Sequence, residues 1–297
     1  MSTESPKTLV LMDTLYNMYM LKGEPHNNIL FKPLMKKSRK KDYIYRLIRK
    51  IHLSSCIGKK EIWFADWVQY VNDYDTIVLG ETGNTYNVAK YIKKKYPNKR
   101  VIIWYRNSIS HSVSPLKFKN SICEIWSFDK EDCDKYNIKY NPQFYIYNPQ
   151  YAAKEYEYDA FFIGKDKGRL EKILKLEELL KTKGLRTKFC IVGYNSSYLS
   201  YSEILDYISK SKAIIDIQGD WQNGITLRPL EALFYNKKLI TNSIEVLNSD
   251  YYHPNNIYIL EQEERDIQEF MESNIYITPR SIINKYNLES WVNRFYY

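Results

Sequence analysis

Short apolar runs alternate with segments of helical periodicity along the first half of the chain. A short run rich in β-branched residues predicts a buried strand, and apolar residues recurring every three or four positions predict a helix. We expect strands at residues 9–12, 76–79, 101–105 and 122–128, and helices at 16–21, 88–96 and 130–136. Strand and helix in regular alternation predict a parallel sheet with helices on both faces.

The second half of the chain repeats this pattern. Strands are expected at 160–163, 189–192, 213–217 and 239–241, and helices at 170–183, at 201–211 and from Thr226 onward. Thr226 can cap its helix, and Pro229 in the first turn loses no hydrogen bond. We expect Leu230, Leu233 and Phe234 to form the buried stripe of this helix. The fold class is therefore α/β, with a parallel sheet in each half.

A stretch rich in Tyr, Asn and Pro separates the two halves. Residues 141–157 contain Pro142 and Pro149 and show neither helical nor strand periodicity. Such composition is typical of a crossing between domains. We therefore expect an N-terminal domain over residues 1–148 and a second domain over residues 149–278.

Four charged residues lie within two positions of the ends of predicted strands of the first domain. They are Asp13, Glu81, Arg106 and Asp129. Ligands of parallel α/β sheets bind at the carboxyl ends of the strands. These side chains are therefore expected along one rim of the first sheet.

Composition agrees with a globular, intracellular chain. Its 297 residues, 44% of them apolar, suffice for two domains with separate cores. The four cysteines, Cys56, Cys123, Cys133 and Cys190, have no metal-ligand spacing, and we expect reduced thiols in a cytoplasmic protein. The N-terminus is too polar for a secretion signal, and no segment is apolar enough to span a membrane.

The net charge of +9 is concentrated in one segment. Residues 32–50 hold nine Lys or Arg against one acid, Asp42, with apolar residues at helical spacing near the end. Three interpretations remain open. The segment is a solvated helix face, a surface for anionic lipid headgroups on the inner face of the cell membrane, or a nucleic-acid surface. No recognised binding motif accompanies the charge, so no nucleic-acid partner is expected.

Two loops of the second domain carry candidate anion-binding chemistry. One runs Gly164-Lys165-Asp166-Lys167-Gly168-Arg169, and the other leads into the helix that contains Arg228. The first lacks the G-K-[ST] of a Walker loop. Free N–H groups at a helix start bind anions, so the two loops together predict a clamp for a diphosphate. A solvated turn is the alternative interpretation of the first loop.

The second loop resembles the nucleotide-sugar segment of GT-B glycosyltransferases, written E-G-F-G-L-P-P-L-E. Here it runs Asn223-Gly224-Ile225-Thr226-Leu227-Arg228-Pro229-Leu230-Glu231. Short bacterial transferases of capsule and lipopolysaccharide synthesis are similar also in the phrases GKDKGRLEKI and LRPLEALF…KKLITN. The resemblance covers residues 120–260 well and the first 100 residues poorly. It implies two Rossmann-like domains facing a cleft, with residues 279–297 forming a helix, over 279–295, that packs back on the first domain.

The resemblance also implies a set of donor-binding residues. Glu231 would hold the ribose hydroxyls from a water-filled cleft, and the Gly193-Tyr194 turn would seat the base. The remaining donor contacts would come from the two loops: Gly164, Lys165, Lys167, Arg169, Asn223, Gly224, Ile225, Thr226, Leu227 and Arg228. Asn223 and Thr226 replace a Glu and a Gly of the family pattern, so the stereochemistry of transfer stays open.

The implied function is sugar transfer from a nucleoside diphosphate donor, expected to be UDP-linked, to a saccharide or lipid-linked saccharide. A base would take the acceptor's proton if the reaction inverts. Asp13 and Glu81 are the candidates, with helix capping as the alternative role, and Arg106 and Asp129 would contact the acceptor. We expect no cofactor and no metal, because the D-x-D triplets at 73–75 and 132–134 lie before a strand and at a helix start. The alternatives are a nucleotide-sugar epimerase and a non-catalytic protein that binds anions or nucleic acid.

Overall fold

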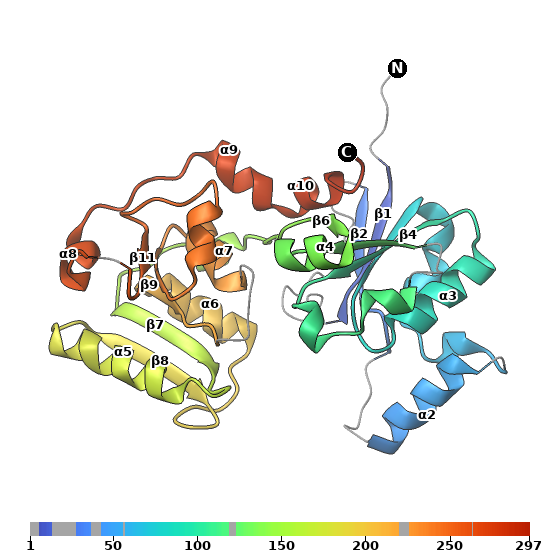
Figure 1. Cartoon of the computed structure of the whole chain (residues 1–297), viewed down its shortest axis with the longest axis horizontal. Helices are drawn as coiled ribbons and strands as arrows, with labels where there is room; N and C mark the ends of the chain where they lie inside the picture. Colours follow the sequence, from blue (N-terminus) through green and yellow to red (C-terminus); the bar gives the residue numbers. More distant parts are fainter. Residues whose placement is uncertain are drawn as a thin grey trace. The chain divides into compact units, whose positions relative to one another are not determined.

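The computed structural model describes residues 6–13, 28–36, 43–55, 57–118, 123–219, 226–262 and 264–297. The chain forms two compact units (Figure 1). Unit 1 comprises Met1–Pro142 and Phe295–Tyr297, and unit 2 comprises Gln143–Arg294. The helix expected at residues 16–21 lies outside the described residues.

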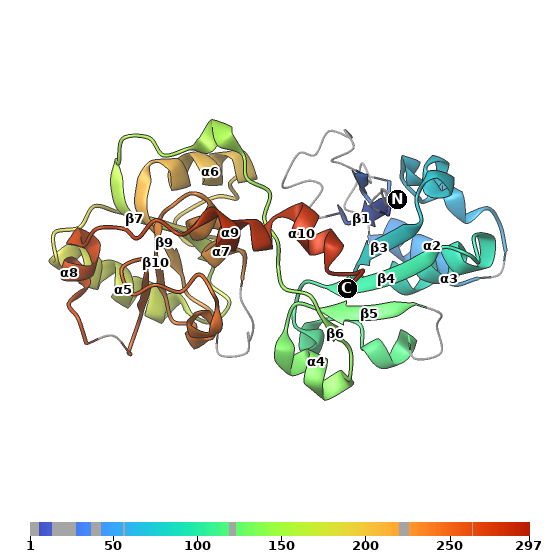
Figure 2. The ribbon, with the colours of Figure 1, turned by 90° about the horizontal axis from the view of Figure 1, so that it is seen from above.

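Unit 1 is built on a parallel sheet of six strands in the order β2-β1-β3-β4-β5-β6. The strands are β1 (Thr8–Leu11), β2 (Ile29–Lys32), β3 (Thr76–Gly80), β4 (Arg100–Tyr105), β5 (Glu124–Ser127) and β6 (Lys139–Tyr140). Figure 2 shows β3, β4 and β5 side by side. The α-helices described in this unit are α2 (Tyr43–Ser54), α3 (Thr85–Lys95) and α4 (Lys130–Tyr136). Five short 3-10 helices lie between them: Lys60–Ile62, Asp66–Gln69, Val71–Asp73, Ile109–His111 and Pro115–Phe118.

The central strands of unit 1 are buried on both faces. Every residue of β1, β2 and β3 is buried, which explains why they read as continuous apolar runs rather than as alternating patterns. Residues from β1, β3 and β4 share one core cluster with Trp67 and with α3. The chain end adds to this unit, since the Phe295 ring packs edge-on against Trp126 at 5.0 Å.

Unit 2 is built on a parallel sheet of five strands in the order β11-β10-β9-β7-β8. The strands are β7 (Tyr158–Lys165), β8 (Thr187–Val192), β9 (Ser211–Asp216), β10 (Lys238–Thr241) and β11 (Ile257–Ile259). The helices are α5 (Leu170–Thr182), α6 (Tyr201–Ser209), α7 (Leu227–Phe234), α8 (Ile267–Glu272), α9 (Arg280–Ile283) and α10 (Leu288–Asn293), with 3-10 helices at Pro149–Tyr151, Ile244–Asn248 and Asn284–Tyr286. Alternate strand residues share a core cluster with α5 and α8, and α6 and α7 contact β9.

The two sheets have the same strand order around their first strand. In unit 1 the chain leaves β1 for β2 on one side and returns to pair β3 on the other side. In unit 2 it leaves β7 for β8 on one side and returns to pair β9 on the other. Each sheet therefore has a topological switch point, between β1 and β3 and between β7 and β9. Ligands of open α/β sheets bind outside the carboxyl ends of the strands at such a point.

These sheets confirm the predicted α/β fold, with one doubly wound parallel sheet in each half. The single helix expected over residues 279–295 is wrong, because α9 and α10 are separate short helices joined by the 3-10 turn at Asn284–Tyr286. The stripe predicted for α7 is also wrong in part. Leu230 is buried, but Leu233 and Phe234 are only half-buried, and Pro229, Glu231 and Ala232 are the other buried residues of the helix.

Candidate functional site

The loop after β7 is shaped by a left-handed turn. Lys167 and Gly168 have φ angles of 49° and 79°. The Asp166 carboxylate accepts hydrogen bonds from the N–H groups of Arg169 (3.0 Å) and Leu170 (2.8 Å), at the start of α5. Asp166 thus fixes the loop to the helix start, while Lys165 and Lys167 remain exposed at the carboxyl end of β7.

Arg169 links the loops after β7 and β9. Its guanidinium donates to the Lys165 carbonyl through Nε (3.4 Å) and Nη2 (3.3 Å), and through Nη1 to the Ile217 carbonyl. Gly164 makes room for this arrangement, because a Cβ there would lie 3.0 Å from Arg169 Nη2 and 3.0 Å from the Phe162 ring. Arg169 therefore holds the two sides of the switch point together.

The start of α7 is tied to the end of β9. Thr226 caps the helix by accepting a hydrogen bond from the Arg228 N–H (3.3 Å), as the sequence predicts. The Thr226 hydroxyl donates to the Asp216 carboxylate (2.9 Å), which also accepts from Gln218 Nε2 (3.2 Å). Asp216, the last residue of β9, thus holds the beginning of α7 at the switch point.

Glu231 is completely buried and hydrogen-bonded within unit 2. Its carboxylate accepts from Arg228 Nη1 and from the Tyr201 hydroxyl (2.8 Å). The Tyr201 hydroxyl is in turn hydrogen-bonded to the Tyr145 hydroxyl (2.9 Å). The expectation that Glu231 faces a water-filled cleft is wrong, because the buried face of α7 includes its carboxylate. Arg228 keeps 19% of its side chain exposed, whereas the side chain of Glu231 is completely buried.

Several charges at this edge shift one another's ionisation. Burial, then Arg169 and Lys165, lowers the pKa of Lys167. Burial also lowers the pKa of Arg169, with Arg228 adding to the effect and Asp216 opposing it. Burial raises the pKa of Asp216, although Gln218 and Thr226 hydrogen bonds act against that shift. Arg228 is thus close enough to Arg169 to lower its pKa, and Arg169 and Lys165 act in the same way on Lys167. Such a group of cations favours binding of an anion.

The Gly193-Tyr194 turn lies at the carboxyl end of β8, next to β7. Gly193 has a φ of 89°, a conformation that favours glycine. Tyr194 is 60% exposed, and Asn195 fastens the turn by accepting from the Ile191 N–H (2.7 Å) and donating to the Phe189 carbonyl (3.1 Å). An exposed aromatic ring on a fixed turn can stack on a planar base.

In unit 1, Asp13 and Glu81 follow the two strands that flank the switch point, β1 and β3. Asp13 Oδ1 accepts from the N–H groups of Leu34 (2.7 Å) and Met35 (3.0 Å), which fixes the segment after β2. Glu81 accepts a longer bond from the Val113 N–H (3.4 Å). Burial raises the pKa of both carboxyl groups, against the effect of these hydrogen bonds.

The two residues predicted to contact an acceptor lie farther along the same edge, after β4 and β5. Arg106 is half-buried. Asp129 is buried and caps α4, accepting from the N–H groups of Glu131 (3.0 Å) and Asp132 (3.3 Å). Its carboxylate is therefore occupied by a helix start, the alternative role considered for Asp13 and Glu81, and an acceptor role gains no support.

The remaining predicted donor residues, Asn223, Gly224 and Ile225, lie outside the described residues. Leu227 begins α7. Sequence reasoning missed Asp216, Tyr201 and Tyr145. Asp216 interrupts an otherwise apolar strand, and that break was a usable signal. Tyr201 and Tyr145 carried no such signal, because the chain has 29 tyrosines and nothing in the sequence distinguishes these two.

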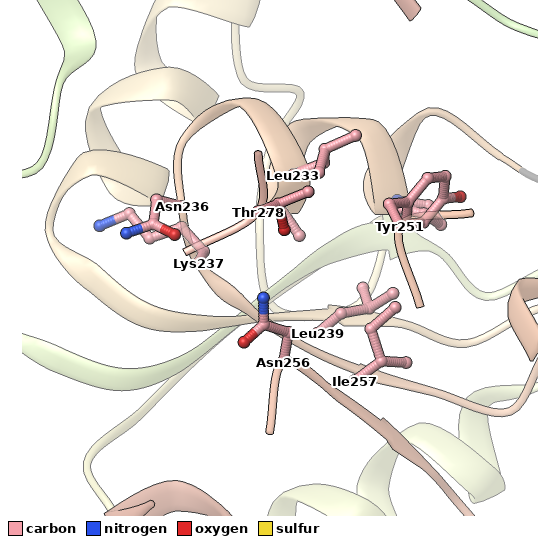
Figure 3. A pocket seen from close by; sticks show the side chains of 10 residues that line it. Leu233, Asn236, Lys237, Leu239, Tyr251, Asn256, Ile257 and Thr278 are labelled. Atoms are coloured by element: carbon pink, nitrogen blue, oxygen red, sulfur yellow. The ribbon is translucent and has the colours of Figure 1, made fainter. Parts of the chain in front are cut away.

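A separate hollow of unit 2 lies beside α7, with an empty volume of about 300 Å³. Figure 3 shows its lining side chains, among them Leu233, Leu239 and Ile257. The one cation of that lining, Lys237, donates to the Ser209 carbonyl (3.0 Å) and lies 4.5 Å from the centre of the Tyr156 ring. The hollow therefore lacks the clustered charge found at the switch point.

Within the described ranges, no group of three or more His, Cys, Asp or Glu side chains is placed to hold a metal ion. In the same part of the chain, no helix combines the length and apolar character needed to cross a bilayer. Cys123, Cys133 and Cys190 are free thiols.

Comparison with known proteins finds similarity at the level of structure only. No protein-family model and no curated sequence matches the chain. The structure of the lipopolysaccharide outer core galactosyltransferase WaaB, in its apo form, matches 97% of this chain and 98% of its own, with 12% identity and a TM-score of 0.48. An α1,3-fucosyltransferase structure matches 100% of this chain and 83% of its own, with 9% identity and a TM-score of 0.41.

Proposed function

We propose that the protein is a glycosyltransferase that binds a nucleoside diphosphate-sugar at the switch point of unit 2. The observation that carries the proposal is the gathering of Lys165, Lys167, Arg169 and Arg228 at the ends of β7 and β9, beside the capped start of α7. The leaving diphosphate gains negative charge as the glycosidic bond breaks. Cations and helix N–H groups held in place before the reaction stabilise that charge.

The donor's parts are assigned to separate residues of this edge. Lys165, Lys167 and Arg228 contact the phosphates, while Arg169 holds the two loops in position. The base, which we expect to be uracil, stacks on Tyr194. Transfer proceeds without a metal, and the acceptor is a saccharide or lipid-linked saccharide of cell-surface polysaccharide synthesis, reached from the cytoplasm or from the inner membrane face.

Glu231 has a different role in this proposal from the one that its family resemblance implies. We assign it to positioning Arg228, because its carboxylate is buried and already accepts two hydrogen bonds. A titration of UDP and of 2′-deoxy-UDP into the wild type and Glu231→Ala tests the assignment. If Glu231 does not touch the ribose, the loss of binding free energy caused by Glu231→Ala and the loss caused by removing the 2′-hydroxyl should add. A coupling above about 1 kcal/mol would instead show direct contact of Glu231 with the ribose.

Glu81 is the better candidate for the catalytic base of an inverting reaction. Its hydrogen bond from the Val113 N–H is long, and the Ser112 side chain also donates to it, whereas Asp13 Oδ1 accepts from two N–H groups at 2.7 and 3.0 Å. Its raised pKa makes Glu81 a stronger base than an ordinary carboxylate. Glu81→Gln should therefore reduce turnover by at least about 100-fold and leave UDP affinity unchanged.

Product analysis distinguishes transfer from epimerisation. The protein is incubated with each of a panel of UDP-, GDP- and dTDP-sugars, with and without saccharide acceptors and lipid-linked saccharides. A glycosyltransferase releases the nucleoside diphosphate in step with glycosylated acceptor. Conversion of the nucleotide sugar without any acceptor would assign the protein to the epimerases, and tight binding of DNA or RNA with no turnover would identify a non-catalytic anion-binding protein.

A further inference from the structure

Helix α2 presents an apolar stripe to solvent. Ile44, Leu47, Ile48 and Ile51 follow the spacing i, i+3, i+4 and i+7, which places them on one face of a helix. Their exposed fractions are 62%, 43%, 52% and 60%. Tyr43, in the first turn, is 71% exposed. In a helix packed on its own domain this stripe would be the buried face.

The opposite face of α2 fixes the helix to unit 1 in this orientation. Leu53 is buried, and the Tyr45 ring packs edge-on against Trp63 at 5.2 Å. Trp63 Nε1 donates to His52 Nδ1 (2.6 Å). The Lys60 ammonium donates to the carbonyls of Leu53 (2.8 Å) and Ser55 (2.5 Å), which satisfies the C-terminal end of the helix. Specific contacts thus hold the polar and aromatic side inward and the aliphatic side outward.

The charge around the stripe identifies its partner. Helix α2 contains no acidic residue, and Arg46 and Lys50 are exposed on its surface. The segment 32–50, which leads into and includes most of α2, has nine basic residues and one acid. Lys50 and Tyr43 lie next to the aliphatic face on one side, with Arg46 farther round the same side. This arrangement fits the boundary between acyl chains and anionic headgroups.

We propose that α2 lies in the plane of an anionic membrane surface. Ile44, Leu47, Ile48 and Ile51 insert among the upper acyl chains, and Arg46 and Lys50 extend to the headgroup phosphates, with their aliphatic stems along the apolar layer. The inference does not depend on the proposed donor site, which is in the other unit. For an enzyme that glycosylates a lipid-linked saccharide, this contact keeps the protein at the surface that holds the acceptor.

Flotation of the full chain with vesicles tests the inference. The vesicles are phosphatidylcholine alone or phosphatidylcholine mixed with phosphatidylglycerol. Leu47→Ser/Ile48→Ser should lower binding to the anionic vesicles at least tenfold. The matched control is Ile244→Ser/Leu247→Ser, which removes an equally exposed Ile–Leu pair, 50% and 42% accessible, from the 3-10 helix Ile244–Asn248 of unit 2. The control should bind like the wild type.

Two further experiments distinguish insertion of the apolar stripe from binding by charge alone. Arg46→Gln/Lys50→Gln should weaken binding to anionic vesicles and have little effect with neutral ones. In 0.5 M salt, the wild type should still float more than Leu47→Ser/Ile48→Ser, because salt screens the cations but not the apolar contact.

Three results would overturn the inference. The first is that the wild type does not float with anionic vesicles. The second is that Leu47→Ser/Ile48→Ser floats as well as the wild type. The third is that the stripe proves to be a contact between two copies. In the last case the wild type sediments as a dimer, Leu47→Ser/Ile48→Ser sediments as a monomer, and neither floats. Circular dichroism verifies that each variant is folded, and UDP titration of the same samples reports on the donor site separately.

Discussion

Replacing Glu231 by Ala breaks the most deeply buried ion pair described at the candidate donor site. The substitution removes the acceptor of the Tyr201 hydroxyl and leaves the Arg228 guanidinium without its carboxylate partner. Removing one partner of a buried pair costs about 3–5 kcal/mol. Arg228 keeps 19% of its side chain exposed, and water can therefore solvate part of the freed charge. We expect the lower end of this range, about 3 kcal/mol.

This loss should be visible in the thermal unfolding of unit 2. For a domain of this size, each kcal/mol lowers Tm by about 2–4 °C, so Glu231→Ala should lower it by roughly 6–12 °C in calorimetry. Glu178→Ala is the matched control, since Glu178 is an exposed glutamate on α5 of the same unit. A surface substitution of this kind changes stability by less than about 0.5 kcal/mol.

A double-mutant cycle identifies the cause of the loss. Arg228→Met/Glu231→Ala removes both charges. Its loss in free energy of unfolding should therefore be smaller than the sum of the losses of the two single variants, by a coupling energy of at least about 1.5 kcal/mol. A Tm shift of Glu231→Ala no larger than that of Glu178→Ala would refute the buried pair. Additive losses in the cycle would show that Arg228 and Glu231 do not interact in solution.

Three other predictions concern pH, packing and metal ions. Arg100 and then Lys139 lower the pKa of Glu124 from 4.5 to about 2, against the effect of burial. Its stabilising effect is therefore complete above pH 4.5 and is lost as the pH falls toward 2; in urea unfolding, Glu124→Gln should cost about 1–2 kcal/mol at pH 7 and progressively less in acid. Gly164→Val should cost about 1–3 kcal/mol by crowding Arg169 and Phe162, whereas Gly83→Val, with open space around Gly83, should cost less. Sugar transfer should persist in EDTA; complete loss that manganese restores would contradict metal-independent transfer.

Much of the fold could be predicted from the sequence, because most of the buried parallel strands appear in it as continuous apolar runs. Helix α4 has the predicted bounds, 130–136, and Thr226 caps α7 as expected. Strands β2, β6 and β11 were not predicted. The last two have two and three residues, which are too few to show a period, and β2 is a four-residue run that ends at Lys32, where the basic segment begins. The expected C-terminal helix failed because its apolar residues do not reveal the break at Asn284–Tyr286.

The charged residues of the candidate site could be predicted from the sequence, but the contacts that they make could not. Loop cations and a cap before an apolar helix can be recognised from local sequence alone. Local sequence does not reveal which side of α7 turns inward, and Glu231 was expected, from the family resemblance, to face a water-filled cleft. Its spacing of three residues from Arg228 allowed an ion pair on the helix, but the Tyr201 hydroxyl comes from another helix and depends on the tertiary fold.

We expect the switch point of unit 2 to bind the diphosphate of a nucleotide sugar. Titration calorimetry with UDP, GDP, CMP and dTDP tests it in the wild type, in Lys165→Ala/Lys167→Ala and in the control Lys175→Ala/Lys181→Ala. The control removes two exposed cations, each from an ion pair on α5 in the same unit. UDP should bind the wild type and the control equally and should bind the Lys165→Ala/Lys167→Ala protein at least tenfold more weakly. Absence of binding by every nucleotide, or equal affinity for all three proteins, would contradict this expectation.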